Sequence, residues 1–243
     1  RRRVNMGRRA VMVTADSEHE HSVEITASPI RGPGSSISGT VVVFHDVGEI
    51  RGLTRQMSYQ ATHDALTGLI NRHEFERRLD EAMDTAHADE AVHMLFYMDL
   101  DRFKAVNDSC GHVAGDNMLR EVATLIKDQV RDSDFVGRLG GDEFGALLIG
   151  CPIEKARQIA NDICNAIADY RFVWKDKIFN IGISIGLVEI SHVSGSLQDV
   201  MSAADSACYV AKQQGRGTVH VFSARDEAIA RERGDIQWLR ELQ

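Results

Sequence analysis

The stretch Phe135-Val-Gly-Arg-Leu139-Gly140-Gly141-Asp142-Glu143-Phe144-Gly-Ala-Leu-Leu-Ile149 contains two mainly apolar runs separated by two glycines. Short apolar runs bounded by turn signals predict buried β-strands. Adjacent glycines favour a tight turn, because glycine takes positive φ without strain. The stretch therefore predicts a β-hairpin with Asp142 and Glu143 at its turn. Taken alone, an acidic hairpin tip is usually an ordinary solvated turn.

A second acidic feature ends the hydrophobic run Phe96-Tyr97-Met98-Asp99-Leu100-Asp101. Asp99 and Asp101 are two residues apart, so in a strand both point to the same side. Carboxylates at the end of a buried strand are costly unless they are solvated, paired or bound to a cation. Alone, a strand end that reaches solvent explains them as well as a metal site does. If this strand lies beside the hairpin, Asp99, Asp142 and Glu143 converge, and such oxygen ligands suit Mg²⁺.

Basic residues provide a counterpart to these acids. Lys104 follows the Asp99/Asp101 pair, and Lys212 and Arg216 lie four residues apart, on one face of a predicted helix. A solvated helix end is the ordinary explanation for Lys212 and Arg216, because cations favour the negative end of the helix dipole. The functional interpretation is a clamp for a triphosphate.

The apolar pattern around these motifs alternates between strand and helix spacing. Helices are expected to start near residue 72 and to cover about 118–130, 156–167 and 197–213; strands are expected at 92–100, 135–139, 144–149, 172–174, 178–190 and 218–222. This order indicates an α/β fold with a central sheet flanked by helices. Upstream, three strands are expected within residues 10–47, and a helix at about 47–61. The charged tail, residues 224–243, also has a helical pattern.

Composition is that of a globular protein. Of the 243 residues, 43% are hydrophobic and 26% charged, and the formal net charge of −8 argues against nucleic-acid binding. Cys110, Cys151, Cys164 and Cys208 show no metal-binding spacing, so we expect reduced thiols in a cytoplasmic protein. The sequence contains neither a membrane-spanning run nor a signal peptide, and it opens on Arg1 rather than methionine. We therefore expect part of a longer protein, in which a membrane anchor could lie upstream.

Four motifs, in order, resemble those of GGDEF-domain diguanylate cyclases, over a region from about His63 to Phe222. The motifs are Asp64-Ala-Leu66-Thr67-Gly68-Leu69-Ile-Asn71-Arg72; Asp99-Leu-Asp101-Arg-Phe103-Lys104-Ala-Val-Asn107-Asp108 with Gly111-His112 and Gly115-Asp116; Gly140 to Phe144; and Ala204-Asp205-Ser-Ala207-Cys208-Tyr209-Val-Ala211-Lys212-Gln-Gln-Gly215-Arg216. Ile70, Cys208 and Gly217 depart from the residues usual in the family. The resemblance implies a palm-like, nucleotidyl-cyclase-like fold with a mostly antiparallel central sheet flanked by helices.

The resemblance also implies a role for each motif. Mg²⁺, with Mn²⁺ as an alternative, would be held by Asp99, the carbonyl of Leu100, Asp142 and Glu143. The guanine base would be read by Asn107 and Asp116, and the β- and γ-phosphates would be bound by Lys104, Lys212 and Arg216. Asp142 is a candidate for assisting deprotonation of the ribose 3′-OH. Structural roles are expected for Asp101 and His112, and a role in docking the linker for His63.

A second site is predicted at Arg131-Asp-Ser-Asp134, five residues before Gly140. Alone, this pattern would be a surface ion pair, but its spacing is that of the family's product-inhibition site. The flanks resemble other modules. Residues 1–48 would be the last strands of a PAS sensor domain, 49–62 a connector helix, 63–223 the GGDEF domain, and 224–243 a linker toward an EAL domain that lies outside this chain.

The predicted activity is the Mg²⁺-dependent condensation of two GTP molecules into cyclic di-GMP and two pyrophosphates. The motifs describe one GTP site per domain, so activity should require a homodimer, with cyclic di-GMP as product and inhibitor. The full-length protein is expected to be a bifunctional GGDEF-EAL protein. One alternative is a catalytically silent GTP-binding domain that regulates an EAL phosphodiesterase. Another is a different palm-like nucleotidyl cyclase or polymerase with the same two-metal chemistry.

Overall fold

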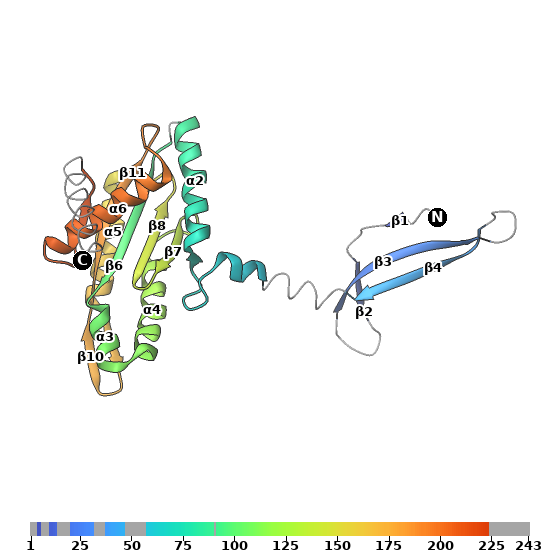
Figure 1. Cartoon of the computed structure of the whole chain (residues 1–243), viewed down its shortest axis with the longest axis horizontal. Coiled ribbons are helices and arrows are strands. Elements are labelled where there is room, and N and C mark those ends of the chain that lie inside the picture. Colours follow the sequence, from blue (N-terminus) through green and yellow to red (C-terminus); the bar gives the residue numbers. More distant parts are fainter. Residues whose placement is uncertain are drawn as a thin grey trace, which may run out of the picture. The chain divides into compact units, whose positions relative to one another are not determined.

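The computed structural model describes residues 4–5, 10–13, 20–31, 37–46, 57–89 and 91–223. These residues fall into two compact units, Arg1–Ala61 and Thr62–Gln243, which are described separately (Figure 1). Most of the predicted connector helix and the whole tail lie outside the described residues, although residues 57–62 are helical. No helix of the described part is both long and apolar enough to cross a bilayer.

The first unit is an antiparallel sheet in which the central strand β3 pairs with every other strand. Its strands are β1 (Val4–Asn5), β2 (Ala10–Val13), β3 (Glu20–Arg31) and β4 (Ile37–Asp46). The three strands expected here are therefore present. Apolar side chains of β4, from Val41 to Phe44, are each more than two-fifths exposed.

The second unit is built on a six-stranded sheet, in the order β12-β11-β6-β8-β7-β5 (Figure 1). These strands are β5 (Ile70–Asn71), β6 (His93–Asp101), β7 (Phe135–Gly140), β8 (Glu143–Leu148), β11 (Gly182–Ile190) and β12 (Val219–Val221). The β11/β12 and β5/β7 pairs are parallel, and the other three are antiparallel. The expected mostly antiparallel central sheet is confirmed.

Helices cover both faces of this sheet. They are α2 (Arg72–Asp89), α3 (Phe103–Cys110), α4 (His112–Lys127), α5 (Ile153–Asp169) and α6 (Leu197–Gln213). Side chains alternate along β6, so Met94, Phe96 and Met98 pack in the core with α4 and α5. Leu95 and Tyr97 pack on the opposite face, with α2 and α6. Because Asp99 continues this second series, its side chain belongs to the α2/α6 face.

One expected strand, at 178–190, is two strands. β10 (Lys177–Asn180) pairs back on β9 (Arg171–Trp174), while β11 begins at Gly182 and pairs with β6. The turn between β9 and β10 includes Lys175 with a positive φ of 53°, and β9 and β10 form a separate two-stranded sheet. The sequence pattern missed the break because Ile178, Phe179 and Ile181 continue the apolar pattern up to β11 and only Ile181 separates the two strands.

Candidate active site

The predicted acids converge at the ends of two neighbouring strands. Asp99 on β6 lies directly opposite Glu143 on β8 in the antiparallel register. The Leu100 N–H donates a hydrogen bond to the Asp142 carbonyl oxygen (N···O 3.2 Å), which ties the hairpin turn to β6. Residues opposite each other in such a pair have Cβ atoms about 4.5–5.5 Å apart. The structure therefore brings together the strand end and the hairpin tip, as the sequence predicted.

Asp99 is largely buried. Its side chain is 15% exposed, and its Oδ2 atom lies 2.6 Å from the Nζ atom of Lys212. Burial raises the pKa of Asp99 to about 6; Lys212 opposes this rise, whereas the charges of Asp142 and Glu143 add to it. Burial also acts against the charge on Lys212, but pairing with Asp99 outweighs it and raises the pKa of Lys212. The acid cluster therefore requires a nearby cation, and Lys212 provides one.

Tyr97 lies near Glu143 on the same face of the sheet. The Tyr97 side chain is buried, and its phenol is close enough to feel the charge of the Glu143 carboxylate. Burial is the first cause that raises the pKa of Tyr97, followed by the negative charge of Glu143, so the phenol remains a neutral donor. Beside this pair is a cavity of about 350 Å³, with Tyr97, Arg72 and Asp205 among the residues in its wall.

A hard divalent ion fits the chemistry of these donors, which are carboxylates and a backbone carbonyl. In the described part of the chain, however, no three acidic, histidine or cysteine side chains are arranged to hold a metal ion. The Lys212 ammonium holds one of the two Asp99 carboxylate oxygens, Oδ2. The four-member ligand set of Asp99, Leu100, Asp142 and Glu143 therefore stays a prediction, and an ion that takes Oδ2 would have to displace Lys212.

The predicted base-reading residues lie on α3 and α4. The Asn107 Oδ1 atom is buried and has no hydrogen-bond partner among the described residues. Gly115 on α4 leaves room for it, since a Cβ atom there would lie 2.0 Å from Asn107 Oδ1. Asp116 follows on the same helix and is half-buried. A buried acceptor without a donor is costly, so Asn107 is suited to a ligand that presents N–H groups.

The remaining predicted cations are more exposed. Lys104 lies on the solvent-exposed surface of α3. Arg216 is 56% exposed and its Nε atom lies 4.0 Å from Asp101 Oδ1. Asp101 is 5% exposed and accepts hydrogen bonds from Ser184 Oγ and the Gly217 N–H, each at 2.9 Å. The structural role expected for Asp101 is confirmed, because it anchors the loop that follows α6.

Comparison with known proteins agrees with this geometry. Residues 61–218 match the family described as diguanylate cyclase, GGDEF domain. The chain belongs to the GGDEF diguanylate cyclase family. It is 44% identical over 232 residues to the probable diguanylate cyclase DgcE of Escherichia coli, an alignment that covers 94% of this chain and 21% of DgcE.

Two further relatives extend the comparison. The cyclic di-GMP phosphodiesterase PdeB of Shewanella oneidensis is 32% identical, over 89% of this chain and 25% of PdeB. The chain thus spans about a fifth to a quarter of these curated relatives. The coiled coil and GGDEF domain of DgcB from Caulobacter crescentus, solved in complex with c-di-GMP, superposes with a TM-score of 0.68 and 29% identity, covering 72% of this chain and 93% of that one.

Arg138 makes contacts within the GGDEF domain, with Asp64 and Gly141, that the sequence did not predict. Its Nε and Nη2 atoms donate to the Gly141 carbonyl oxygen (3.0 and 2.8 Å), and its Nη1 donates to Asp64 Oδ1 (3.2 Å). Burial raises the pKa of Asp64, but hydrogen bonds from Thr67 and the charge of Arg138 outweigh it and lower the pKa. Arg138 therefore joins the opening turn to the hairpin turn. The one signal in the sequence was a cation, Arg138, shortly before the two glycines of the hairpin turn. It did not identify Asp64 as the partner, which lies 74 residues away in the sequence.

Arg131 and Asp134, the predicted inhibitory pair, differ in exposure. Asp134 is 6% exposed, and its two carboxylate oxygens accept hydrogen bonds from the backbone N–H groups of Arg131 (3.2 Å) and Ile149 (3.1 Å). The Arg131 side chain is exposed. Asp134 thus stabilises the turn before β7, and of the two side chains Arg131 is the more accessible to a ligand.

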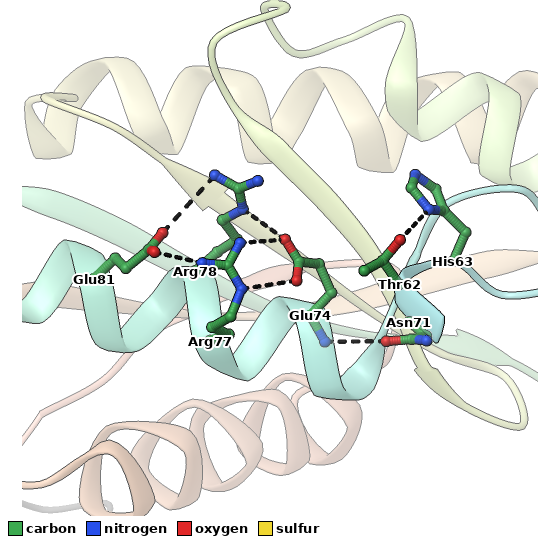
Figure 2. A network of polar contacts seen from close by, with 7 residues as sticks. All are labelled: Thr62, His63, Asn71, Glu74, Arg77, Arg78 and Glu81. Carbon is green, nitrogen blue, oxygen red and sulfur yellow. Dashed lines mark hydrogen bonds and ion pairs between the residues drawn. The ribbon is translucent and has the colours of Figure 1, made fainter. Parts of the chain in front are cut away.

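A polar network fixes the first turns of α2, beside the opening turn (Figure 2). Asn71 Oδ1 accepts a hydrogen bond from the Glu74 N–H at 3.0 Å, which caps the helix. The buried Glu74 carboxylate pairs with Arg77 and Arg78, and the hydrogen bond from Arg77 is the main cause that lowers its pKa to about 2. His63, expected to dock the linker, has its Nδ1 atom 2.9 Å from Thr62 Oγ1.

Proposed function

We propose that this chain is a diguanylate cyclase module that condenses two GTP molecules into cyclic di-GMP and releases two pyrophosphates. The convergence of Asp99, Asp142 and Glu143 carries the proposal. It lies at the end of β6, directly before α3 with its unpartnered Asn107 oxygen. An acid cluster near a buried acceptor suits a ligand with phosphates, which a cation can bridge, and a base edge rich in N–H groups.

Each side chain has a distinct task in this proposal. Asp99, the Leu100 carbonyl, Asp142 and Glu143 would hold Mg²⁺, or Mn²⁺ in its place, and members of the family generally need a divalent metal. When bound, such an ion supplies charge stabilisation to the attacking and leaving oxygens. Asp142 would accept the proton of the ribose 3′-OH.

Substrate recognition would fall to α3, α4 and the end of α6. The Asn107 amide oxygen would accept from guanine N–H groups, and Asp116 would accept from N1–H and N2–H₂. Lys104, Lys212 and Arg216 would bind the β- and γ-phosphates. The exposure of Lys104 and Arg216 supports this role, because both can reach a ligand without breaking a buried contact.

The reaction joins two nucleotides, whereas the motifs describe one GTP site per domain. We therefore propose that two GGDEF domains meet face to face, each with one GTP, so that activity requires a homodimer. Product inhibition is proposed at Arg131 and Asp134. Because Asp134 is engaged by backbone amides, Arg131 would make the principal contact, binding guanine or phosphate through its planar guanidinium.

The proposed domain plan assigns residues 1–48 to the end of a PAS domain, 49–62 to a connector helix, 63–223 to the GGDEF domain and 224–243 to a linker toward an EAL domain. The antiparallel sheet of the first unit supports the first assignment. The similarity to PdeB, a cyclic di-GMP phosphodiesterase, supports the last. We propose a cytoplasmic location, in keeping with four free cysteines.

The test is formation of cyclic di-GMP from GTP and Mg²⁺ by the whole chain and by three variants. Asp142→Ala and Glu143→Ala should abolish product, because both remove proposed ion ligands. Asp80→Ala, which removes an exposed acid on α2, should leave the rate unchanged. Undiminished product formation in the first two variants would contradict the assignment.

A second candidate function is supported by the similarity to PdeB. In this alternative the domain binds GTP without turnover and regulates an attached phosphodiesterase. GTP binding without cyclic di-GMP formation, even at high protein concentration, would favour it. A different palm-like nucleotidyl cyclase remains the third alternative, and competition between GTP and ATP tests it, since Asn107 and Asp116 should select guanine.

A further inference from the structure

Lys212, a proposed phosphate ligand, is paired with a carboxylate. Its Nζ atom is 2.6 Å from Asp99 Oδ2, and the two side chains are 31% and 15% exposed. Arg216, four residues later, lies near Asp101 instead. The two cations of the closing motif therefore differ: Arg216 is mainly in solvent, and Lys212 is paired with an acid that is a proposed ion ligand.

Tight packing of α6 on β11 fixes the position of Lys212. A Cβ atom at Gly186 would lie 2.2 Å from the Ala204 carbonyl oxygen and 2.3 Å from the Cys208 nitrogen, so the helix backbone rests directly on the strand. Cys208 Sγ donates to the Ser184 carbonyl oxygen at 3.2 Å, and Ser184 is the register partner of Asp99. Lys212 lies one helical turn after Cys208, on the same face, and therefore above Asp99.

The position of the ammonium sets up a competition. An ammonium at hydrogen-bond distance and a divalent ion cannot both take the same carboxylate oxygen, because the two cations repel each other and the ion requires close contact with its ligands. An ion that takes Asp99 Oδ2 must therefore displace Lys212 from that oxygen. The displaced ammonium is half-buried and needs another anion, and phosphate groups of a nucleotide are suitable partners.

We propose that Lys212 is an exchangeable counter-ion of Asp99: it holds this carboxylate until a divalent ion takes it, and then turns to the nucleotide phosphates. The inference rests on the proposed function for the placement of the ion at Asp99. The ion and the nucleotide should therefore bind with positive coupling. An ion at Asp99 frees Lys212 for the phosphates, and phosphates that bind Lys212 leave Asp99 free for the ion. Coupling between two ligands is reciprocal and typically changes affinity about 5- to 150-fold.

The first test measures Mn²⁺ affinity in the whole chain without nucleotide, from the electron paramagnetic resonance signal of free Mn²⁺. Lys212→Met should bind Mn²⁺ roughly tenfold more tightly than the wild type, because the competing ammonium is gone. Lys177→Met is the matched control: Lys177 Nζ donates to the Ser109 carbonyl oxygen, and its removal should leave the affinity unchanged. Asp99→Asn should lose this Mn²⁺ site. Equal or weaker Mn²⁺ binding by a folded Lys212→Met variant overturns the proposal.

The second test needs no variant and so does not depend on whether Lys212→Met folds. Lysines of the wild type are labelled with an amine-reactive ester, with and without saturating Mn²⁺, and the rate at each lysine is read by mass spectrometry. Lys212 should react several-fold faster with Mn²⁺, while Lys177 should not change. An unchanged rate at Lys212 overturns the proposal.

Neither test involves turnover, so this inference and the proposed function can fail separately. A wild type that makes cyclic di-GMP but shows no exchange of Lys212 contradicts the counter-ion role alone. A wild type that shows the exchange but makes no cyclic di-GMP contradicts the cyclase assignment alone.

Discussion

The two ends of strand β6 use polar residues in opposite ways. At its start, His93 is buried with both ring nitrogens engaged: Nδ1 accepts from the Gly150 N–H (3.0 Å), and Nε2 lies 2.9 Å from Thr85 Oγ1. At its end, Asp99 depends on a lysine from a distant helix. The polar groups of His93 are completely satisfied and those of Asp99 are not, which is the contrast expected between a structural residue and a proposed ion ligand.

The same contrast recurs within two residues at the site end. Asp101 has a hydrogen-bond donor of the domain itself on each carboxylate oxygen, whereas Asp99 has a cation that can leave. Asp99 and Asp101 belong to the same sequence motif, so the motif does not distinguish them. Their hydrogen-bond and ion-pair partners in the folded protein do.

The largest effect is expected at Asp99. Asp99→Asn should lower the rate of cyclic di-GMP formation by about a thousandfold, equivalent to about 4 kcal/mol in the barrier, because a charged ligand of the reacting groups is lost. The melting temperature should change little, since the amide is isosteric and Lys212 keeps the negative charge of Asp142 nearby. Asp80→Asn on the exposed face of α2 is the control for rate. A variant that retains a tenth of the wild-type rate would place Asp99 outside the reaction.

Asp101→Asn should affect mainly stability. Replacing one oxygen by an NH₂ group leaves a single amide oxygen for two donors, Ser184 Oγ and the Gly217 N–H, and removes the charge that strengthens both hydrogen bonds, so we expect a loss of about 3 kcal/mol in the free energy of unfolding. Urea denaturation measures it, with Asp80→Asn again as control. If stability is unchanged and only the rate falls, Asp101 acts as Asp99 does and the contrast between the two is wrong.

Arg138→Met should have an intermediate effect. The variant removes a part-buried hydrogen bond to Asp64 and exposed hydrogen bonds to the Gly141 carbonyl, and should cost about 2 kcal/mol of unfolding free energy. It should also loosen the turn that carries Asp142 and thereby reduce the rate. Arg157→Met, at an exposed position on α5, is the matched control. Similar losses in the two variants would show that the link between the turns is unimportant.

The smallest effect concerns pH at the other end of β6. Burial lowers the pKa of His93, so the folded protein keeps this ring neutral while the unfolded chain takes up a proton below about pH 6.5. The unfolded state then binds more protons, and the contribution of His93 to the unfolding free energy, complete above pH 6.5, is lost as pH falls. Denaturation between pH 7 and 5 should therefore show a shallower decline in His93→Gln than in the wild type. His192→Gln, at an exposed position, should retain the wild-type slope.

Strands and site acids were predictable from the sequence because their signals are local. Apolar runs located β6, β7 and β8, and the convergence of Asp99 with the hairpin required only that these strands be neighbours. Helix α3 was missed: it has eight residues, begins after Arg102 in a left-handed conformation with φ 66°, and has no side-chain cap. Such a helix shows neither the length nor the start signal on which sequence patterns depend.

Contacts between distant segments were not predictable. Arg138 meets Asp64, and Lys212 meets Asp99, only after the sheet order and the packing of α6 are set. Family resemblance placed Lys212 at the phosphates but gave no information about its partner before they bind. Gly186 illustrates the reason. Its lack of a side chain lets α6 pack closely on β11 and so places Lys212 over Asp99, and a pattern of apolar residues does not reveal such close packing.

The strand order places the two ends of the GGDEF domain at opposite edges of its sheet. The segment entering the GGDEF domain reaches the sheet at one edge, where His63 bridges Ile70 of β5, and the last described strand, β12, forms the opposite edge. Of the proposed site acids, Asp99 lies on β6 and Glu143 on β8, in the interior of the sheet. Segments fused before the domain and after it therefore join at opposite edges of the sheet and leave β6 and β8 in place. This arrangement suits a domain that is combined with others in longer proteins.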